Sequence, residues 1–502
     1  MATRRIKKIL IANRGEIAVR VIRTCRELEI QTVAVYSDAD RNAMHVQMAD
    51  EAYRLGPPPS GQSYLLQEKV IEAARLSGAD AIHPGYGFLS ENAEFAEACE
   101  DAGVLFVGPP PEAIRLMGDK TAARTLMAEA GVPMAPGTMS AIEDDEAAAR
   151  AAEEIGYPVL IKAAAGGGGK GMRVVSQPSN FLREMAMAQS EALSSFGDPR
   201  VFIEKYITRP RHIEIQILAD AHGHVIHLFE RECSIQRRHQ KVIEEAPSSV
   251  LTPEIRTHMG AAAVEAARSC GYVNAGTVEF LVDDDLNFYF MEMNTRLQVE
   301  HPVTEWITGI DLIAEQIRIA EGAELGYVQE DLGMSGHAIE CRIYAEDPSN
   351  EFLPDPGELL RHHLPAGIGV RVDNGVEEGG RVEIHYDPMI SKVTTWGRTR
   401  KAAIERMSRA LREYEIAGVR TTIPFCRFVM DHEAFRSGQL STHFVADHFE
   451  AEKLQDPDPA LEEAAAIIAA IMHEESSDAH IEPSKTENGI ARPPWIRRRE
   501  YR

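Results

Sequence analysis

An acidic strand carries the strongest sign of chemistry in this sequence. Residues 288–294, Phe-Tyr-Phe-Met-Glu-Met-Asn, alternate at the two-residue period of a β-strand, which puts Glu292 and Asn294 on the same face. A second strand-like run, which contains Glu279, precedes them across an Asp-rich turn. A hairpin with its tip at residues 285–286 would set Glu279 directly opposite Glu292.

Two facing carboxylates make this hairpin a candidate cation site. Side chains directly opposite each other in a hairpin have Cβ atoms about 5 Å apart, so two negative charges there repel. A hard divalent cation such as Mg²⁺ is the natural partner, with substrate phosphates as its remaining ligands. Hydrated acids on an exposed hairpin would explain the pair alone equally well. Chemistry is favoured because Arg296, Gln298 and Glu300 continue the same alternation, while Leu297 and Val299 take the other face.

Length and charge limit the classes of partner. With 502 residues the chain exceeds a single ordinary core, and two to four domains are expected. A net charge of −25 and a pI near 5.2 argue against nucleic acid or an anionic membrane as a partner. An anionic substrate needs local Lys and Arg, which occur at residues 231–241, Lys162, Lys170 and Arg296. Residues 231–241 lie between predicted strands, so an anion pocket is preferred there to a solvated face.

The cysteines and the N-terminal residues favour a cytoplasmic location. The six cysteines are scattered and form no Cys-x-x-Cys pair, which is typical of a reducing compartment. The basic start is followed by four apolar residues before Asn13, too few for the apolar region of a signal peptide. No apolar run is long enough to span a bilayer. We expect a soluble, cytoplasmic protein.

The first forty residues show the strand-helix-strand rhythm of a doubly wound α/β fold. Apolar residues 8–12 and 32–36 predict strands, and residues 16–28 between them have helical spacing. A nicotinamide site is a weaker interpretation, because the turn at Gly15 lacks the Gly-x-Gly-x-x-Gly pattern. We therefore expect a mostly parallel sheet without that cofactor.

Two lysines and a run of glycines predict a phosphate site. Lys120 stands in the first turn of a helix that Asp119 would cap; a nearby anion would favour a lysine there, and a solvated surface lysine is the alternative. Lys162 ends a predicted strand, and residues 166–171, which are rich in glycine, lead into another strand. Backbone N–H groups in such a loop can approach phosphate oxygens. The following strand excludes a Walker A loop, so we expect a phosphate-covering flap rather than a mobile linker.

Taken together, these motifs resemble biotin carboxylase, an ATP-grasp enzyme. The resemblance covers residues 6–450 and rests on Lys162 with its glycine loop, Glu-Lys-Tyr at 204–206, Gln-Arg-Arg-His-Gln-Lys at 236–241, Glu279, and Glu-Met-Asn-Thr-Arg-Leu-Gln-Val-Glu-His-Pro at 292–302. It implies an α/β protein with four parts. These are a Rossmann-like N-terminal domain (1–118), an ATP-grasp domain (119–333) with a mobile lid (134–207), a C-terminal biotin carboxylase domain (334–450) and an extension (451–502).

The resemblance also implies a role for each site residue. Glu300 would be the general base that deprotonates bicarbonate, and Arg342 would bind biotin and stabilise its enolate. The catalytic residues would be Arg296, Glu300, Lys241 and Arg342. ATP would be bound by Lys120, Lys162, Gly168, Gly169, Glu204, Lys205, Tyr206, Ile207, His212, Gln236, His239, Glu279 and Glu292. The ligands of Mg²⁺ or Mn²⁺ would be Glu279, Glu292 and Asn294, and bicarbonate would be bound by Lys241, Arg296, Gln298 and Val299.

The sequence lacks a Met-Lys-Met biotinylation motif. The resemblance therefore implies two partners, a separate biotin carboxyl carrier protein and a carboxyltransferase, in an acetyl-CoA, propionyl-CoA or pyruvate carboxylase complex. An acetyl-CoA carboxylase would act in fatty acid biosynthesis. The family further suggests a homodimer. The final acyl acceptor stays open.

The last fifty residues differ in composition from the rest. Residues 461–473 form a candidate helix rich in Ala and Ile, residues 474–489 have the composition of a disordered segment, and the end is basic with two aromatic residues. A segment that docks another protein of the complex is preferred to a dangling terminus.

Two other functions compete with a biotin carboxylase. Another ATP-grasp ligase with an amine acceptor is disfavoured by Arg296, Gln298, Glu300 and Arg342. A non-catalytic protein that binds ATP for regulation would be expected to lack a metal ligand or the base, and the sequence has both.

Overall fold

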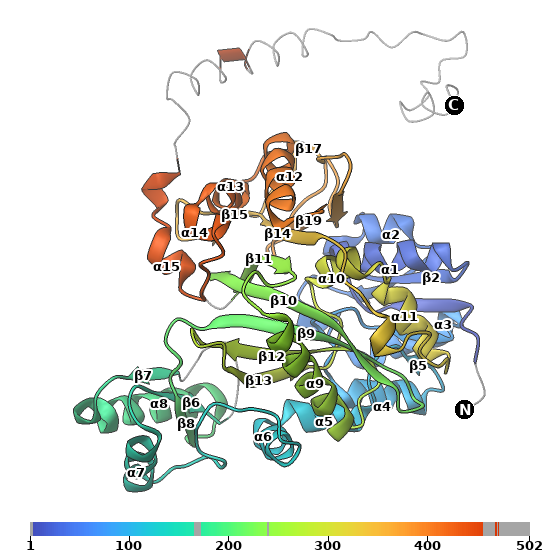
Figure 1. Ribbon diagram of the computed structural model, residues 1–502. Helices are drawn as coiled ribbons and strands as arrows, with labels where there is room; N and C mark the ends of the chain where they lie inside the picture. Colours follow the sequence, from blue (N-terminus) through green and yellow to red (C-terminus); the bar gives the residue numbers. More distant parts are fainter. Residues whose placement is uncertain (1–3, 165–171, 238–239, 455–466, 469, 471–502) are drawn as a thin grey trace, which may run out of the picture. The chain divides into compact units, whose positions relative to one another are not determined.

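A computed structural model describes the chain over residues 4–164, 172–237, 240–454, 467–468 and 470 (Figure 1). The described residues divide into two units, separated between Ala451 and Glu452. The sheets and the site below all belong to the first unit. No helix among the described residues has the length and apolar character that crossing a membrane requires.

The predicted strand-helix-strand rhythm forms a five-stranded parallel sheet. Its strands, in spatial order, are β3 (Glu51–Gly56), β2 (Gln31–Ser37), β1 (Lys8–Ile11), β4 (Ala81–His83) and β5 (Leu105–Phe106). Successive residues of β1, Leu10 and Ile11, are both fully buried, as expected for a parallel sheet covered on both faces. The accompanying helices are α1 (Gly15–Glu27), α2 (Met44–Met48), α3 (Gln67–Ser77), α4 (Ala93–Asp101) and α5 (Pro111–Gly118), with 3₁₀ turns η1 (Asp38–Asp40) and η2 (Ser60–Gln62). The predicted α/β class is confirmed.

A second, three-stranded sheet follows Lys120. Its antiparallel strands, in spatial order, are β7 (Arg173–Val175), β6 (Val159–Ala163) and β8 (Val201–Lys205). Helix α6 (Lys120–Glu129) precedes it, with Asp119 accepting hydrogen bonds from the N–H groups of Thr121 and Ala122, as the predicted cap requires. The other helices are α7 (Asp145–Ile155), η3 (Pro178–Asn180) and α8 (Phe181–Phe196).

The site rests on an eight-stranded antiparallel sheet (Figure 1). Its strands, in spatial order, are β13 (Phe288–Asn294), β12 (Asn274–Val282), β9 (Arg211–Ala219), β10 (Val225–Arg237), β11 (Gln240–Ala246), β14 (His337–Tyr344), β19 (Met389–Gly397) and β18 (Val370–Asn374). Pairing of β11 with β14 joins strands from both sides of the expected division at residue 333. Residues far apart in sequence therefore share one face of a single sheet.

Helices and short strands complete the described part of this unit. Apolar residues from the large sheet and α12, such as Ile339, Val393 and Met407, are fully buried in one core. The helices are α9 (Pro253–Ser269), α10 (His301–Thr308), α11 (Leu312–Ala320), α12 (Arg400–Glu413), α13 (Ile423–Asp431), α14 (Glu433–Arg436) and α15 (Phe444–His448), with η4 (Gln329–Asp331); η5 (Ala451–Lys453) spans the boundary between the units. The short strands are β15 (Glu346–Asp347), β16 (Leu353–Pro354), β17 (Arg361–His363) and β20 (Glu415–Ala417).

Candidate functional site

The predicted hairpin forms, and its acidic residues face each other. Glu279 on β12 pairs directly with Glu292 on β13. A register shift after Glu279 centres the turn on Asp285 rather than between residues 285 and 286, and the N–H of Asp283 donates to the carbonyl of Asn287. The facing-carboxylate prediction is confirmed.

A third glutamate extends this pair. Glu279 also pairs directly with Glu214 on β9, and Glu214 pairs with Arg231 on β10. Three carboxylates therefore stand side by side across three neighbouring strands, where like charges destabilise a sheet unless cations offset them. Glu214 is not among the site residues predicted from the sequence, although the alternation of His212, Glu214 and Gln216 along β9 indicates it.

The predicted continuation of the alternating strand through Glu300 is wrong. Strand β13 ends at Asn294, the chain turns, and helix α10 begins at His301. The turn nevertheless brings the predicted side chains together. The amides of Asn294 and Gln298 donate to Glu279 Oε1 at 2.8 and 2.9 Å, and the Arg296 guanidinium donates to the side-chain oxygens of both amides at 3.0 and 3.3 Å.

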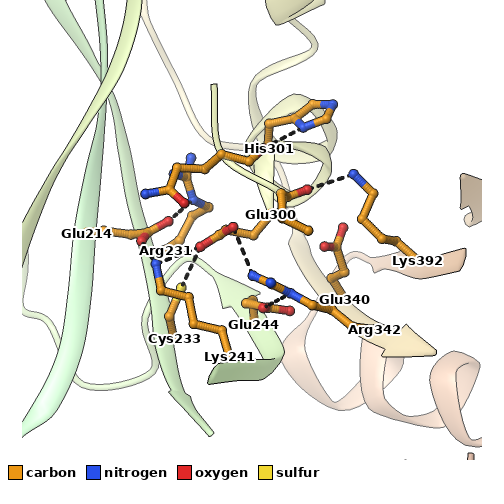
Figure 2. Close-up of polar contacts among 12 residues, drawn as sticks. Glu214, Arg231, Cys233, Lys241, Glu244, Glu300, His301, Glu340, Arg342 and Lys392 are labelled. Carbon is orange, nitrogen blue, oxygen red and sulfur yellow. Dashed lines mark hydrogen bonds and ion pairs between the residues drawn. The ribbon is translucent and has the colours of Figure 1, made fainter. Parts of the chain in front are cut away.

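Lys241 contacts three of the acidic residues, and Figure 2 shows it close to Glu214 and Glu300. Its ammonium contacts one oxygen each of Glu214, Glu279 and Glu300, at 2.5, 2.9 and 2.7 Å. These glutamates are almost completely buried, with Glu300 showing no exposed surface. In this structure the ammonium of Lys241 therefore offsets negative charge that we expected a metal ion to neutralise.

Burial and pairing shift the pKa values of this cluster in opposite directions. Burial alone would lower the pKa of Lys241, but the three carboxylates hold that pKa well above its usual range. Burial alone would raise the pKa of Glu300, yet Lys241, Arg342 and Arg231 hold it well below its usual range. Glu279 has a lowered pKa because Lys241 and His212 outweigh its burial. All three groups are charged at neutral pH.

The described basic side chains of residues 231–241 contact different acidic residues. Arg231 is fully buried on β10 and bonds to Glu214 and, at 2.6 Å, to Gln216. Arg237 points instead to Glu346. Within the described part of the run, Arg231 and Lys241 both reach the acidic cluster: Arg231 contacts Glu214, and Lys241 contacts Glu214, Glu279 and Glu300.

Arg342 joins the cluster from β14. Its guanidinium donates to Glu244 Oε1 at 2.6 Å and to Glu300 Oε2 at 3.0 Å (Figure 2). Glu244 has a pKa raised to about 7 by its burial, which the charge of Arg342 opposes. The carboxylate of Glu300 is thus held between two cations, Lys241 at one oxygen and Arg342 at the other.

The lysines predicted to bind phosphate lie near a buried glutamate. Lys162 on β6 contacts Glu204 Oε2 at 2.6 Å, and Arg124 of α6, which the sequence analysis missed, contacts the other oxygen. Lys120 has a lowered pKa because burial, together with the charge of Lys162, opposes its protonation. Two lysines and an arginine close to one another favour an anion between them.

Of the other residues predicted to bind the nucleotide, two make contacts away from the carboxylates, Lys205 and Tyr206, and His212 lies beside the carboxylates. The ammonium of Lys205 donates to the carbonyl oxygens of Gly156 and Tyr157 at 2.8 and 3.1 Å, so this side chain supports the β6–β8 sheet. Tyr206 contacts His443 Nε2 through its hydroxyl at 3.4 Å, and Ile207 follows it. His212 stands near the carboxylates, with Nε2 3.0 Å from Glu279 Oε2 and Nδ1 3.0 Å from Gln236 Nε2. Gly168, Gly169, Lys170 and His239 lie outside the described residues.

The donors around Glu292 suit a hard cation. Glu292 is exposed at the edge strand, and partial desolvation together with the negative charge of Glu279 raises its pKa. Bringing a divalent cation to Glu279, Glu292 and the side-chain oxygen of Asn294 would relieve that repulsion with oxygen ligands alone. The residues present therefore fit Mg²⁺ or Mn²⁺.

Acidic residues on a large antiparallel sheet, with one lysine on a smaller sheet and another in the helix that precedes it, define an ATP-grasp type of site. Three family descriptions match this chain: "Biotin carboxylase, N-terminal domain" at residues 5–114, "Carbamoyl-phosphate synthase L chain, ATP binding domain" at 119–328, and "Biotin carboxylase C-terminal domain" at 340–447. The chain belongs to the biotin carboxylase family.

Relatives of known name agree with that assignment. Biotin carboxylase 1 of Bacillus subtilis is 57% identical over 441 residues, which cover 88% of this chain and 98% of that protein. The biotin carboxylase of Halalkalibacterium halodurans is 53% identical over 451 residues, which cover 90% of this chain and 100% of that protein.

Two solved structures are similar over most of the chain. The biotin carboxylase domain dimer of Hydrogenobacter thermophilus 2-oxoglutarate carboxylase, crystallised with MgADP, ADP and bicarbonate, is 48% identical with a TM-score of 0.85 and covers 91% of this chain and 100% of that one. A biotin carboxylase complex with a β,γ-ATP compound from Campylobacter jejuni has the same identity and TM-score and covers 88% and 99%.

Removing the ammonium of Lys241 should change how the stability of the protein depends on pH. In the native protein the folded pKa of Glu279 and Glu300 lies below the unfolded value of about 4.3, so their stabilising contribution is complete above about pH 5 and is lost at lower pH. Lys241→Met leaves buried carboxylates whose folded pKa is raised, and their ionisation then opposes folding as pH rises. We expect a loss of about 3 kcal/mol or more at pH 8, and a smaller one at pH 5.5.

Urea denaturation at the two pH values measures this difference. Lys69→Met is the matched control, because the Lys69 ammonium bonds to the carbonyls of Leu55 and Gln62 rather than to carboxylates. A loss of stability for Lys241→Met that is equal at both pH values would contradict the electrostatic account.

Proposed function

We propose that this chain carboxylates biotin with bicarbonate at the expense of ATP. The observation that carries the proposal is the convergence of Lys241, Glu300 and Arg342, with Arg296 and Gln298 bonded into the same cluster. A fixed carboxylate between two cations, next to further cationic and amide donors, is suited to receive a small anion and remove its proton.

Bicarbonate would bind where these donors meet. The donors proposed for it are Lys241, Arg296, Gln298 and the backbone of Val299. In the described structure each of these three side chains is already engaged with a protein oxygen. An incoming anion must therefore replace an oxygen of Glu279, Glu300 or Asn294 as the acceptor of these hydrogen bonds. Binding of the anion would thus rearrange the charges around Glu300.

Glu300 is the proposed general base. Its lowered pKa makes it a weak proton acceptor while Lys241 and Arg342 contact it. Transfer of Lys241 to a bound anion would remove one cation and raise the proton affinity of Glu300. The base would thus become active when bicarbonate is present, and its deprotonated substrate could attack the terminal phosphate of ATP in line to form carboxyphosphate.

ATP would occupy the region between the lysines and the acidic row. Lys120 and Lys162, with Gly168 and Gly169, are proposed to hold phosphates, while residues 204–207 are proposed to contact adenine. His212, Gln236 and His239 would line the nucleotide. Bound Mg²⁺ or Mn²⁺ would neutralise phosphate charge that develops during transfer, held by Glu279, Glu292 and Asn294.

The second step would use Arg342. Carboxyphosphate breaks down to CO₂ and phosphate, and phosphate can take the proton from the ureido nitrogen of biotin. The guanidinium of Arg342 is a donor that remains charged at any physiological pH, so it is suited to stabilise the biotin enolate that captures CO₂.

The biological setting is also a proposal. We infer a separate biotin carboxyl carrier protein and carboxyltransferase as partners, a homodimer because the Hydrogenobacter thermophilus structure is described as a dimer, and a cytoplasmic location because all six cysteines are free. The similar proteins are named for several acceptors, which include pyruvate and 2-oxoglutarate. The division at residues 118, 333 and 450, with 451–502 as a docking segment, belongs to this proposal.

The decisive experiment is a steady-state assay of ATP cleavage with and without bicarbonate and free biotin. We expect ADP release to require both. ADP release with an amine in place of biotin would indicate a different ATP-grasp ligase. Binding of ATP without its cleavage would indicate a non-catalytic regulatory protein.

Replacing the proposed base should separate binding from chemistry. Glu300→Gln is expected to bind ATP as the native protein does but to lose about 10²- to 10⁴-fold in bicarbonate-dependent ADP release. Glu305→Gln, a buried acid-to-amide change in α10 where the carboxylate bonds to Arg20 and Arg371, should keep most of the rate. An undiminished rate in Glu300→Gln would remove Glu300 from this role.

Removing the exposed carboxylate of the row should weaken the metal site. Glu292→Ala is expected to raise the Mg²⁺ concentration for half-maximal ATP cleavage about tenfold or more, because one ligand is lost. The control is Asp284→Ala, an exposed acid in the turn of the same hairpin. Titration of both variants with Mg²⁺ at saturating ATP tests the role, and an unchanged Mg²⁺ requirement in Glu292→Ala would refute it.

A further inference from the structure

Lys392 is a completely buried lysine that the proposed chemistry does not use. Its side chain, on β19, has no exposed surface. Figure 2 shows Lys392 close to the segment that carries Glu300. Its ammonium donates to the backbone carbonyl of Val299 at 2.7 Å and lies 3.3 Å from Oε2 of Glu16, a residue of α1. It also stands 5.8 Å from the centre of the Tyr86 ring. A buried ammonium is costly unless it is paired, so its contacts are informative.

Lys392 has an anion and a cation as its neighbours across the sheet, Asp373 on β18 and Arg342 on β14. Lys392 and Arg342 are directly paired between β19 and β14, so both side chains leave the same face. Like charges in that arrangement repel. Each contacts an adjacent part of one short segment: Arg342 bonds to the carboxylate of Glu300, and Lys392 bonds to the carbonyl of Val299. Arg342 and Lys392 therefore hold two consecutive residues of the turn, Glu300 and Val299.

The turn that carries Glu300 has few backbone hydrogen bonds to a sheet, because β13 ends at Asn294. Side chains hold its carbonyls instead. The carbonyl of Leu297 accepts from Arg296 at 3.1 Å, that of Gln298 contacts His301 Nδ1 at 2.8 Å, and that of Val299 accepts from Lys392. Because the peptide group is planar, fixing the carbonyl of Val299 also fixes the N–H and Cα of Glu300.

We propose that Lys392 is a positioning residue for the bicarbonate step, acting through the peptide between Val299 and Glu300. Its ammonium sets the orientation of the backbone of Val299 and the base of the Glu300 side chain, and Arg342 sets the carboxylate. Lys392 does not touch the substrate. The inference rests on the proposed function, since it concerns the same site.

The test compares bicarbonate-dependent ADP release, at saturating ATP and free biotin, with the dissociation constant of ATP. Lys392→Met keeps the side-chain length and removes the ammonium. We expect kcat to fall about 10- to 100-fold, the loss typical of one charge-assisted hydrogen bond, while the dissociation constant of ATP changes less than about threefold. Lys392→Arg keeps the charge with a displaced donor and should have a kcat between those of the native protein and Lys392→Met.

Ser391→Ala is the control for damage to the strand. Ser391 is buried beside Lys392 and bonds to the hydroxyl of Tyr414 at 2.7 Å, on the opposite face. It should retain the native kcat. Glu16→Gln tests the ion pair, because it removes the charge of the Lys392 partner but leaves the bond to Val299, and its loss should be smaller than that of Lys392→Met.

Three results would overturn the proposal. These are a native kcat in Lys392→Met, a parallel loss of ATP binding and kcat in that variant, or a loss in Glu16→Gln as large as in Lys392→Met. Should Lys392→Met not fold, Lys392→Arg decides: a reduced kcat at native ATP affinity supports the role, and a native kcat refutes it. Absence of bicarbonate-dependent release in the native protein would instead refute the proposed function.

Discussion

Three glutamates that stand side by side on neighbouring strands impose the main constraint on this structure. Glu214, Glu279 and Glu292 are directly paired across β9, β12 and β13, and two of them are buried. Such a row is unstable without cations. Arg231 neutralises one end from within the sheet, and Lys241 contacts the middle from β11. The other end, at Glu292, is exposed and has a raised pKa because of partial desolvation and the charge of Glu279, and that end is suited to a metal ion.

The same constraint explains why the donors in the site are exchangeable. Lys241 is shared among three carboxylates, so loss of one contact leaves it with the others. A cation that binds Glu279 would release Lys241 from one partner, and the ammonium could then turn to an anion. Binding of a metal and of an anion should therefore support each other through this one side chain.

Local patterns were sufficient to predict part of this arrangement. The facing pair Glu279 and Glu292 followed from strand periodicity and an Asp-rich turn, both of which act over about twenty residues. Other contacts around the site join distant segments. Glu91, which bonds to Arg296 at 3.0 Å, is separated from it by 205 residues, and Arg342 bonds to Glu300 across 42 residues. The assembly of sheets that brings such residues together has no signature in local spacing.

The error at residues 295–300 shows how periodicity can place residues correctly for the wrong reason. An alternating strand would put Gln298 and Glu300 on the same face as Glu292, but about 20 Å or more along the strand from it. The observed turn instead brings Gln298 to Glu279 and Glu300 to Lys241. A strand, however, would bind its backbone groups to a neighbouring strand, whereas the turn leaves carbonyls to be bound by side chains. Arg296, His301 and Lys392 meet that need. Because the carbonyls of the turn need hydrogen-bond donors, charged and polar side chains surround Glu300. The chemistry of the site depends on how these side chains divide their hydrogen bonds between the backbone and the substrate.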